Sequence, residues 1–87
     1  MDAQAILLEL QTLKSEPASA LSRLRELMDV VEQAMPPDRH SKANLAAALT
    51  RQAIEFICDG LEHRQNEPEI NRRFALAIKR AEAWVVA

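Results

Sequence analysis

The placement of helix-breaking residues constrains this chain more than any other feature. Its four prolines stand at positions 17, 36, 37 and 68, and Gly60 is the only glycine. The long stretches between the prolines are therefore free of residues that interrupt a helix. A single glycine also cannot supply a phosphate-binding glycine loop or a series of tight hairpin turns. The sequence therefore favours a helical protein and excludes these two architectures.

Apolar residues recur at helical spacing in four segments between these breaks. Asp2 is placed to cap the first segment, and Asn66, followed by Pro68 and Glu69, marks a strong helix start for the last. Pro36 must end the second segment, because the residue before a proline avoids the helical conformation. The predicted helices span about residues 3–14, 17–34, from 38 or 41 to 63, and 67–86.

The apolar positions of the predicted helices form continuous seams. The seam of the second helix consists of Leu21, Leu24, Met28, Val31 and Met35, and that of the fourth consists of Ile70, Phe74, Ala77, Ala81 and Trp84. Both follow the alternating three- and four-residue spacing of helical bundles. The third helix has a wide apolar arc that includes Leu45, Leu49, Phe56 and Gly60, which suits a helix contacted from two sides.

The connections between the predicted helices are short, which favours antiparallel neighbours. The predicted fold is therefore all-α, a small antiparallel bundle of one short N-terminal helix and three long helices. Neither a linker nor a repeat divides the chain, so residues 1–87 form a single predicted domain. A bundle of this size buries a modest core, and self-association would be a natural supplement to its stability.

Charge and cysteine content limit the classes of function. The formal net charge is −2, whereas a general nucleic-acid binder is usually strongly basic. The lone Cys58 excludes a disulfide framework and a cysteine zinc site and fits a reducing compartment. No targeting segment or membrane span is visible. We therefore expect a cytoplasmic protein without a membrane partner.

The predicted fourth helix carries the strongest candidate for a binding surface. Arg72, Arg73, Lys79 and Arg80 lie on the arc away from its apolar seam, and Leu76 lies among them. An apolar residue surrounded by cations is suited to an acidic amphipathic partner or to nucleotide phosphates, for which arginine offers a bidentate fork. The alternative is an ordinary solvated face with cations near a helix C-terminus.

A column of polar residues on the third helix and the lone Cys58 are both better explained by structural roles than by catalytic or metal-binding roles. Arg51, Glu55, Asp59 and His63 recur every four residues along the third helix, which is the spacing of a ladder of ion pairs. A divalent metal on these carboxylates and the imidazole is the other interpretation, but we predict no metal or cofactor. Cys58 lies at the edge of the apolar arc and is predicted to be a packed thiol rather than a nucleophile.

The sequence contains no catalytic triad, acid pair or glycine loop, so we predict that the protein is not an enzyme. The predicted function is a non-catalytic interaction module that binds a protein partner as an adaptor, inhibitor or small chaperone-like regulator, with self-association as a homodimer. Leu8, Leu76 and Val86 are expected to point outward, and the predicted contact residues are Leu8, Leu76, Arg72, Arg73, Lys79 and Arg80. The alternative is an anionic ligand, nucleic acid or a small nucleotide, on the basic face of the last helix.

Overall fold

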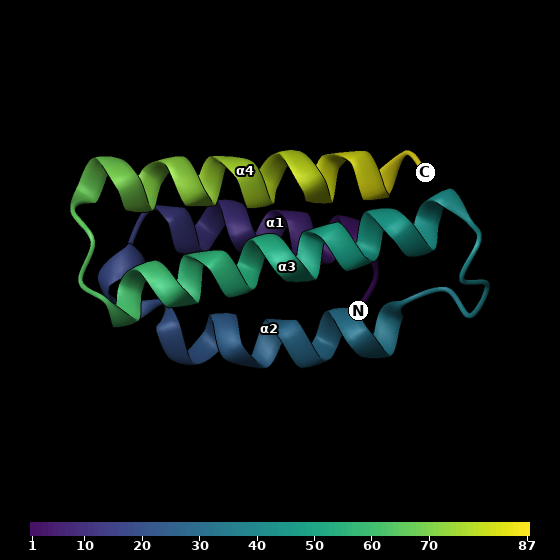
Figure 1. The fold of residues 1–87 in the computed structure, drawn as a ribbon, viewed down its shortest axis with the longest axis horizontal. Helices are drawn as coiled ribbons and strands as arrows, with labels where there is room; N and C mark the ends of the chain where they lie inside the picture. The colour runs from purple at the N-terminus through teal and green to yellow at the C-terminus, as the bar shows by residue number, and fades with distance from the viewer.

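A computed structural model describes all residues from Met1 to Ala87. The protein consists of four α-helices and has no strands. The helices are α1 (Ala3–Lys14), α2 (Leu21–Ala34), α3 (Lys42–Glu62) and α4 (Glu67–Val85). Each helix runs antiparallel to the one before it, so both chain termini lie at the same end of the bundle (Figure 1). The predicted all-α antiparallel bundle is therefore confirmed.

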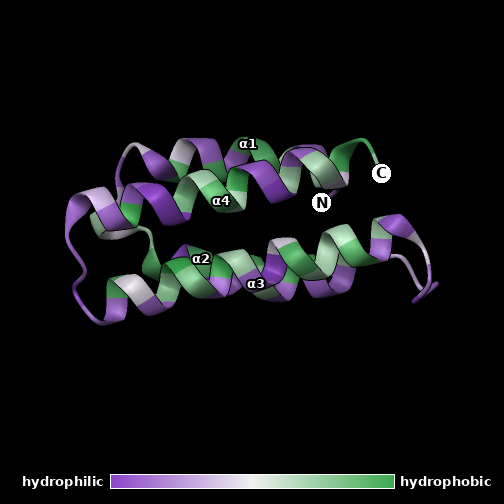
Figure 2. Ribbon diagram, turned by 45° about the horizontal axis from the view of Figure 1, so that its top comes forward, coloured by the Kyte–Doolittle hydropathy of each residue, from purple (hydrophilic) through white to green (hydrophobic).

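The helices are arranged as two pairs, α1 with α4 and α2 with α3 (Figure 2). The most extensive packing joins α3 to α4, and α2 packs on α3 while α1 packs on α4. Although α1 and α2 are consecutive in the chain, they contact each other very little. The contact between α3 and α4 is thus the central one of the bundle. The shorter helix α2 packs on α3, and the shorter helix α1 packs on α4.

Three of the four helices begin with a side-chain cap. Asp2, Ser41 and Asn66 accept hydrogen bonds from the backbone N–H groups of Ala5, Asn44 and Glu69, respectively. These bonds satisfy N–H groups that the first helical turn cannot pair internally. The caps predicted at Asp2 and Asn66 are confirmed.

The predicted start of the second helix at Pro17 is wrong. Pro17–Ser19 forms a separate 3₁₀ turn, labelled η1, and α2 begins only at Leu21. The buried Ala20 precedes α2 and provides no side-chain cap. As a result α2 has 14 residues against 21 in α3 and 19 in α4, so the bundle has two short and two long helices rather than one and three.

The core confirms the seam of α4 in full, since all five predicted residues from Ile70 to Trp84 are buried. In α2 the buried residues are Leu24, Leu27 and Val31, whereas Met28 is only half-buried, so the buried face is rotated slightly from the predicted seam. In α3 the predicted apolar arc is wider than the buried face, since Leu45 is 60% exposed.

None of the helices is long and apolar enough to span a membrane.

Candidate functional site

An apolar groove runs along the outer side of the contact between α3 and α4. It consists of two adjoining hollows of about 350 and 250 Å³ that share Leu49 and Arg80. We call this surface the α3–α4 groove. Its lining residues on α3 are Lys42, Leu45, Ala46, Leu49, Gln52, Ala53 and Phe56. On α4 they are Leu76, Arg80 and Ala83, and Val86 and Ala87 follow directly after this helix.

The groove is exposed because α1 and α2 pack elsewhere on these two helices. Leu45 and Val86 are 60% and 85% exposed at one end of the groove, while Leu49, Phe56 and Leu76 are half-buried further along it. A continuous exposed strip of large apolar side chains on a small protein is typical of a contact surface. Isolated exposed leucines would carry no such implication.

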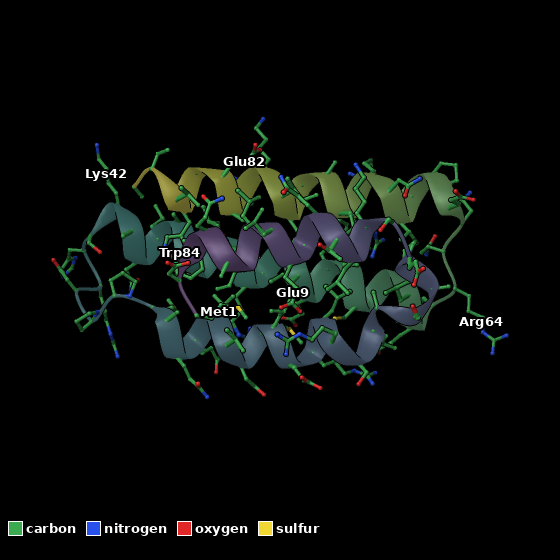
Figure 3. All side chains as sticks on the ribbon, turned by 180° about the vertical axis from the view of Figure 1, so that it is seen from behind. Met1, Glu9, Lys42, Arg64, Glu82 and Trp84 are labelled. Carbon is green, nitrogen blue, oxygen red and sulfur yellow. The ribbon has the colours of Figure 1, made fainter.

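Two cations line one end of the groove without a partner inside the protein. Lys42 stands at the first turn of α3 and Arg80 near the end of α4, and neither belongs to an ion pair. The Lys42 side chain extends into solvent, away from the bundle (Figure 3). No aspartate or glutamate side chain lines this end of the groove.

The prediction that Arg73 belongs to an outward basic face is wrong. Its side chain is buried, with 8% of the residue exposed, and its guanidinium lies 3.8 Å from the centre of the Phe56 ring. Nη1 donates to the Phe56 carbonyl at 2.8 Å and Nε donates to the Glu69 carboxylate at 2.9 Å. Arg73 therefore joins α4 to α3 and is not available to a partner.

Gly60 provides the space that Arg73 occupies. A Cβ atom at this position would lie 2.9 Å from Arg73 Nη1 and 3.0 Å from Ile70 Cδ1, both closer than a Cβ atom normally lies to another side chain. The planar guanidinium stacks on an aromatic face and its stem packs against apolar atoms, which makes burial of this cation tolerable. The sequence signals for this arrangement were Gly60 on the apolar arc and Glu69 four residues before Arg73.

Arg72 is engaged as well, although it is exposed. Its Nε and Nη2 donate to the two carboxylate oxygens of Glu69, at 2.9 and 2.6 Å. Hydrogen bonds from Arg72 and Arg73 lower the pKa of the Glu69 carboxyl to about 2. Of the four predicted cations, only Lys79 and Arg80 remain without an ion pair, and only Arg80 lines the groove.

The structure does not bring the two predicted contact leucines together. Leu76 is half-buried in the α3–α4 groove instead of pointing outward, whereas Leu8 is 53% exposed on α1 and outside the groove. Leu45, Leu49 and Phe56 line the groove, although helical periodicity placed them on the apolar arc of the third helix. The signal for them was the width of that arc, which exceeds what α2 and α4 can cover.

The four-residue column on α3 forms ion pairs, as the ladder interpretation predicts. Arg51 lies 3.3 Å from Glu55, and His63 lies 3.2 Å from Asp59. Arg51 also reaches Glu32 on α2 at 2.7 Å, which ties these helices together. No group of three or more acidic, histidine or cysteine side chains is placed to hold a metal ion.

Cys58 is buried in the core, as the packed-thiol interpretation predicts. Its burial raises the pKa of the thiol, which disfavours the reactive thiolate. The histidine closest to Cys58 in the sequence is His63. Its ring nitrogen Nδ1 lies 2.8 Å from the Asp59 carbonyl oxygen, within its own helix end.

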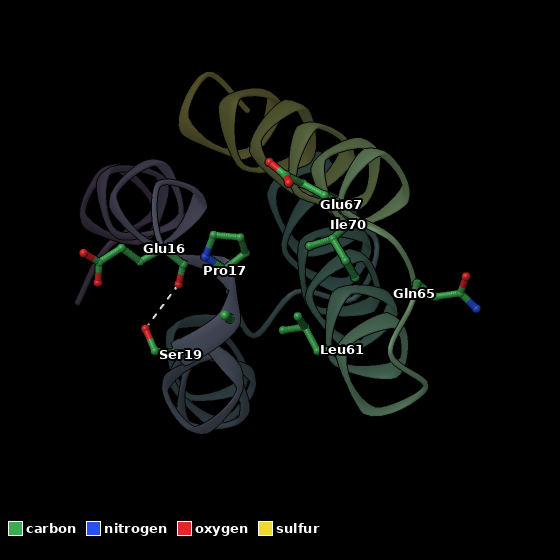
Figure 4. Close-up of a pocket in the computed structure, with 8 residues that line it drawn as sticks. Glu16, Pro17, Ser19, Leu61, Gln65, Glu67 and Ile70 are labelled. Carbon is green, nitrogen blue, oxygen red and sulfur yellow. Dashed lines mark hydrogen bonds between the residues drawn. The ribbon is translucent and has the colours of Figure 1, made fainter.

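The largest hollow, about 680 Å³, lies at the end of the bundle between η1 and the turn from α3 to α4. Leu61 and Ile70 form an apolar wall, but the polar ends of Glu16 and Gln65 point away to opposite sides (Figure 4). Binding pockets for small molecules combine an apolar lining with a few converging polar groups. This hollow lacks that convergence, so the α3–α4 groove is the better candidate site.

Comparison of the chain with protein families, with curated proteins and with solved structures finds no match.

Proposed function

We propose that the protein is a non-catalytic interaction module that binds an amphipathic helix of a partner protein in the α3–α4 groove. The observation that carries this proposal is the apolar strip that runs from the exposed Leu45 and Val86 to the half-buried Phe56 and Leu76. A groove between two helices presents such a strip to the apolar face of a third helix, whose anchors then recur every three or four residues. No residue is assigned a catalytic role.

The dimensions of the groove fit a partner helix of moderate length. Its α3 side runs from Lys42 to Phe56, which is about 21 Å at a rise of about 1.5 Å per residue. A helix of about four turns would cover this length and place an apolar side chain at each turn.

Adaptors, inhibitors and small chaperones all use contacts of this kind. The free Cys58 thiol favours a reducing compartment such as the cytoplasm.

A display library of amphipathic helical peptides tests the proposal directly. Peptides selected on the wild-type protein should lose binding to the Leu45→Glu/Val86→Glu variant, since both substitutions place a carboxylate on the apolar strip. Both side chains are exposed, so the fold should survive the change. The Leu8→Glu variant, altered outside the groove, is the matched control and should bind normally. Failure to enrich any peptide, or equal binding to all three proteins, would contradict the proposal.

The anionic-ligand alternative has less support. Arg73 is buried and Arg72 is held by Glu69, so the expected row of four cations is reduced to Lys79 and Arg80. Nucleic-acid binding relies on several cations that neutralise phosphates together. A ligand of this kind would have to depend on two or three dispersed charges.

Self-association through α1 is a second proposal and rests on a different surface. Leu8 is exposed on a face whose other side chains, Gln4, Gln11 and Thr12, are exposed and uncharged. A symmetric dimer places the same face of two copies together, and an uncharged face avoids repulsion between like charges. This contact would leave the α3–α4 groove free for a partner.

A further inference from the structure

The α3–α4 groove has a strongly uneven distribution of charge along its length. Lys42 and Arg80 line the hollow that contains Leu45 and Val86, with no aspartate or glutamate side chain among the lining residues. Beyond Phe56, at the other end, Glu55 and Asp59 line a further hollow of about 320 Å³. Cations without carboxylate side chains therefore line the hollow at Leu45 and Val86, whereas carboxylates and cations lie together beyond Phe56.

The two ends differ further in how their charges are already satisfied. Glu55 pairs with Arg51 at 3.3 Å, and Asp59 lies 3.2 Å from His63 and 3.6 Å from Arg73. Lys42 and Arg80 have no such partners within the chain. Only the basic end therefore has unsatisfied charge to offer to a ligand.

A helix seated over Leu45 and Val86 would remove water from Lys42 and Arg80. Removing water from an unpaired charge is unfavourable unless an opposite charge replaces the lost hydration. A carboxylate on the docked helix supplies that charge and also speeds the encounter, whereas a lysine at the same place is repelled. The charge of the groove therefore selects among helices with the same apolar ridge.

We propose that the partner is a helix whose apolar ridge is flanked by acidic residues at the end that covers Lys42 and Arg80. This inference rests on the proposed function, because it specifies the chemistry of the helix that the groove binds. The exposed face of α1 in a second copy is a poor occupant, since the side chains around Leu8 carry no carboxylate. The occupant that we propose is an acidic segment of a different protein.

Three helical peptides with the same leucine ridge test this charge requirement. They differ only at two flanking positions near one end, which carry glutamate, glutamine or lysine. Fluorescence anisotropy with labelled peptides gives the dissociation constant of each. The glutamate peptide should bind at least about tenfold more tightly than the lysine peptide, with glutamine between them, and added salt should reduce the difference.

Charge reversal in the protein locates the effect. The Lys42→Glu/Arg80→Glu variant should prefer the lysine peptide, and this inversion does not depend on the intrinsic helicity of the peptides. The Lys14→Glu/Arg39→Glu variant has the same change in net charge at exposed positions outside the groove and should keep the original order. Equal binding of all three peptides to wild type, or no inversion, would overturn the charge requirement while leaving the groove as a helix site. Failure of every peptide to bind would overturn the proposed function itself.

Discussion

At the scale of single residues, the contact of Arg73 with Gly60 fixes the central helix pair. The guanidinium bonds to the Phe56 carbonyl on α3 and to Glu69 on its own helix, and it stacks on the Phe56 ring. The absence of a side chain at Gly60 is what allows this approach. A residue that resembled part of a binding surface is therefore an internal connection, and it holds one wall of the α3–α4 groove.

Substituting Gly60 by alanine tests this connection. Alanine normally stabilises a helix interior by about 1 kcal/mol relative to glycine. Here we expect a net loss of up to about 2 kcal/mol in the free energy of unfolding, because overpacking against Arg73 and Ile70 costs about 1–3 kcal/mol. Urea denaturation followed by circular dichroism measures the change. The loss should be smaller in an Arg73→Ala background, and a gain in stability for Gly60→Ala alone would refute the account.

Glu69 makes the stability depend on pH. Its pKa is lowered from an ordinary value near 4.5 to about 2 in the folded state, so its contribution is complete above about pH 4.5 and is lost as the pH falls toward 2. The Glu69→Gln variant should be less stable than wild type at pH 7, and the difference should shrink between pH 4.5 and 2. Denaturation curves at several pH values provide the test. A difference that stays constant over this interval would contradict the assignment.

At the scale of whole helices, periodicity and capping residues explain most of the architecture. The seam of α4 and the caps at Asp2 and Asn66 were predictable because they depend on local spacing and on short polar side chains. The start of α2 was not, because proline is equally acceptable in the first turn of an α-helix and in a 3₁₀ turn. The exposure of Leu45 and the burial of Arg73 depend on which helices are neighbours, and local spacing does not contain that information.

The cap of α4 provides a test at this scale. Asn66 accepts a hydrogen bond from Glu69 N–H at 3.1 Å. The Asn66→Ala variant should lose about 1 kcal/mol of unfolding free energy, whereas Asn66→Asp should be close to wild type, since aspartate caps equally well. Thermal denaturation of the three proteins under identical conditions makes the comparison. Equal stability of the alanine variant would show that the cap contributes nothing.

At the scale of the whole molecule, the bundle is strongly connected through α3 and α4 and only weakly between α1 and α2. Arg23 on α2 reaches across to Glu9 on α1, where the two side chains form an ion pair, and this bond lowers the pKa of the Glu9 carboxyl. Figure 3 shows Glu9 between these two helices. The molecule presents two different outer surfaces. One is the uncharged face of α1 around Leu8, and the other is the α3–α4 groove, whose apolar lining is flanked by the cations Lys42 and Arg80.

The uncharged face predicts an oligomeric state. Size-exclusion chromatography with light scattering should give twice the chain mass for the wild type and the chain mass for Leu8→Glu, because a carboxylate on each copy would meet its equivalent across a symmetric contact. The Leu45→Glu variant, changed in the groove, should remain a dimer. A wild-type protein that stays monomeric at high concentration would exclude this contact without affecting the groove.

The most direct test of the central claim is a nuclear magnetic resonance titration of the isotope-labelled protein with a leucine-ridge helical peptide that carries glutamates at one end. The account predicts chemical-shift changes concentrated along the α3–α4 groove, at Lys42, Leu45, Leu49, Leu76, Arg80 and Val86. Amides near Leu8 on α1 and near Leu61 at the end of the bundle should not respond. Shifts centred on either of those places, or no shifts at all, would contradict it.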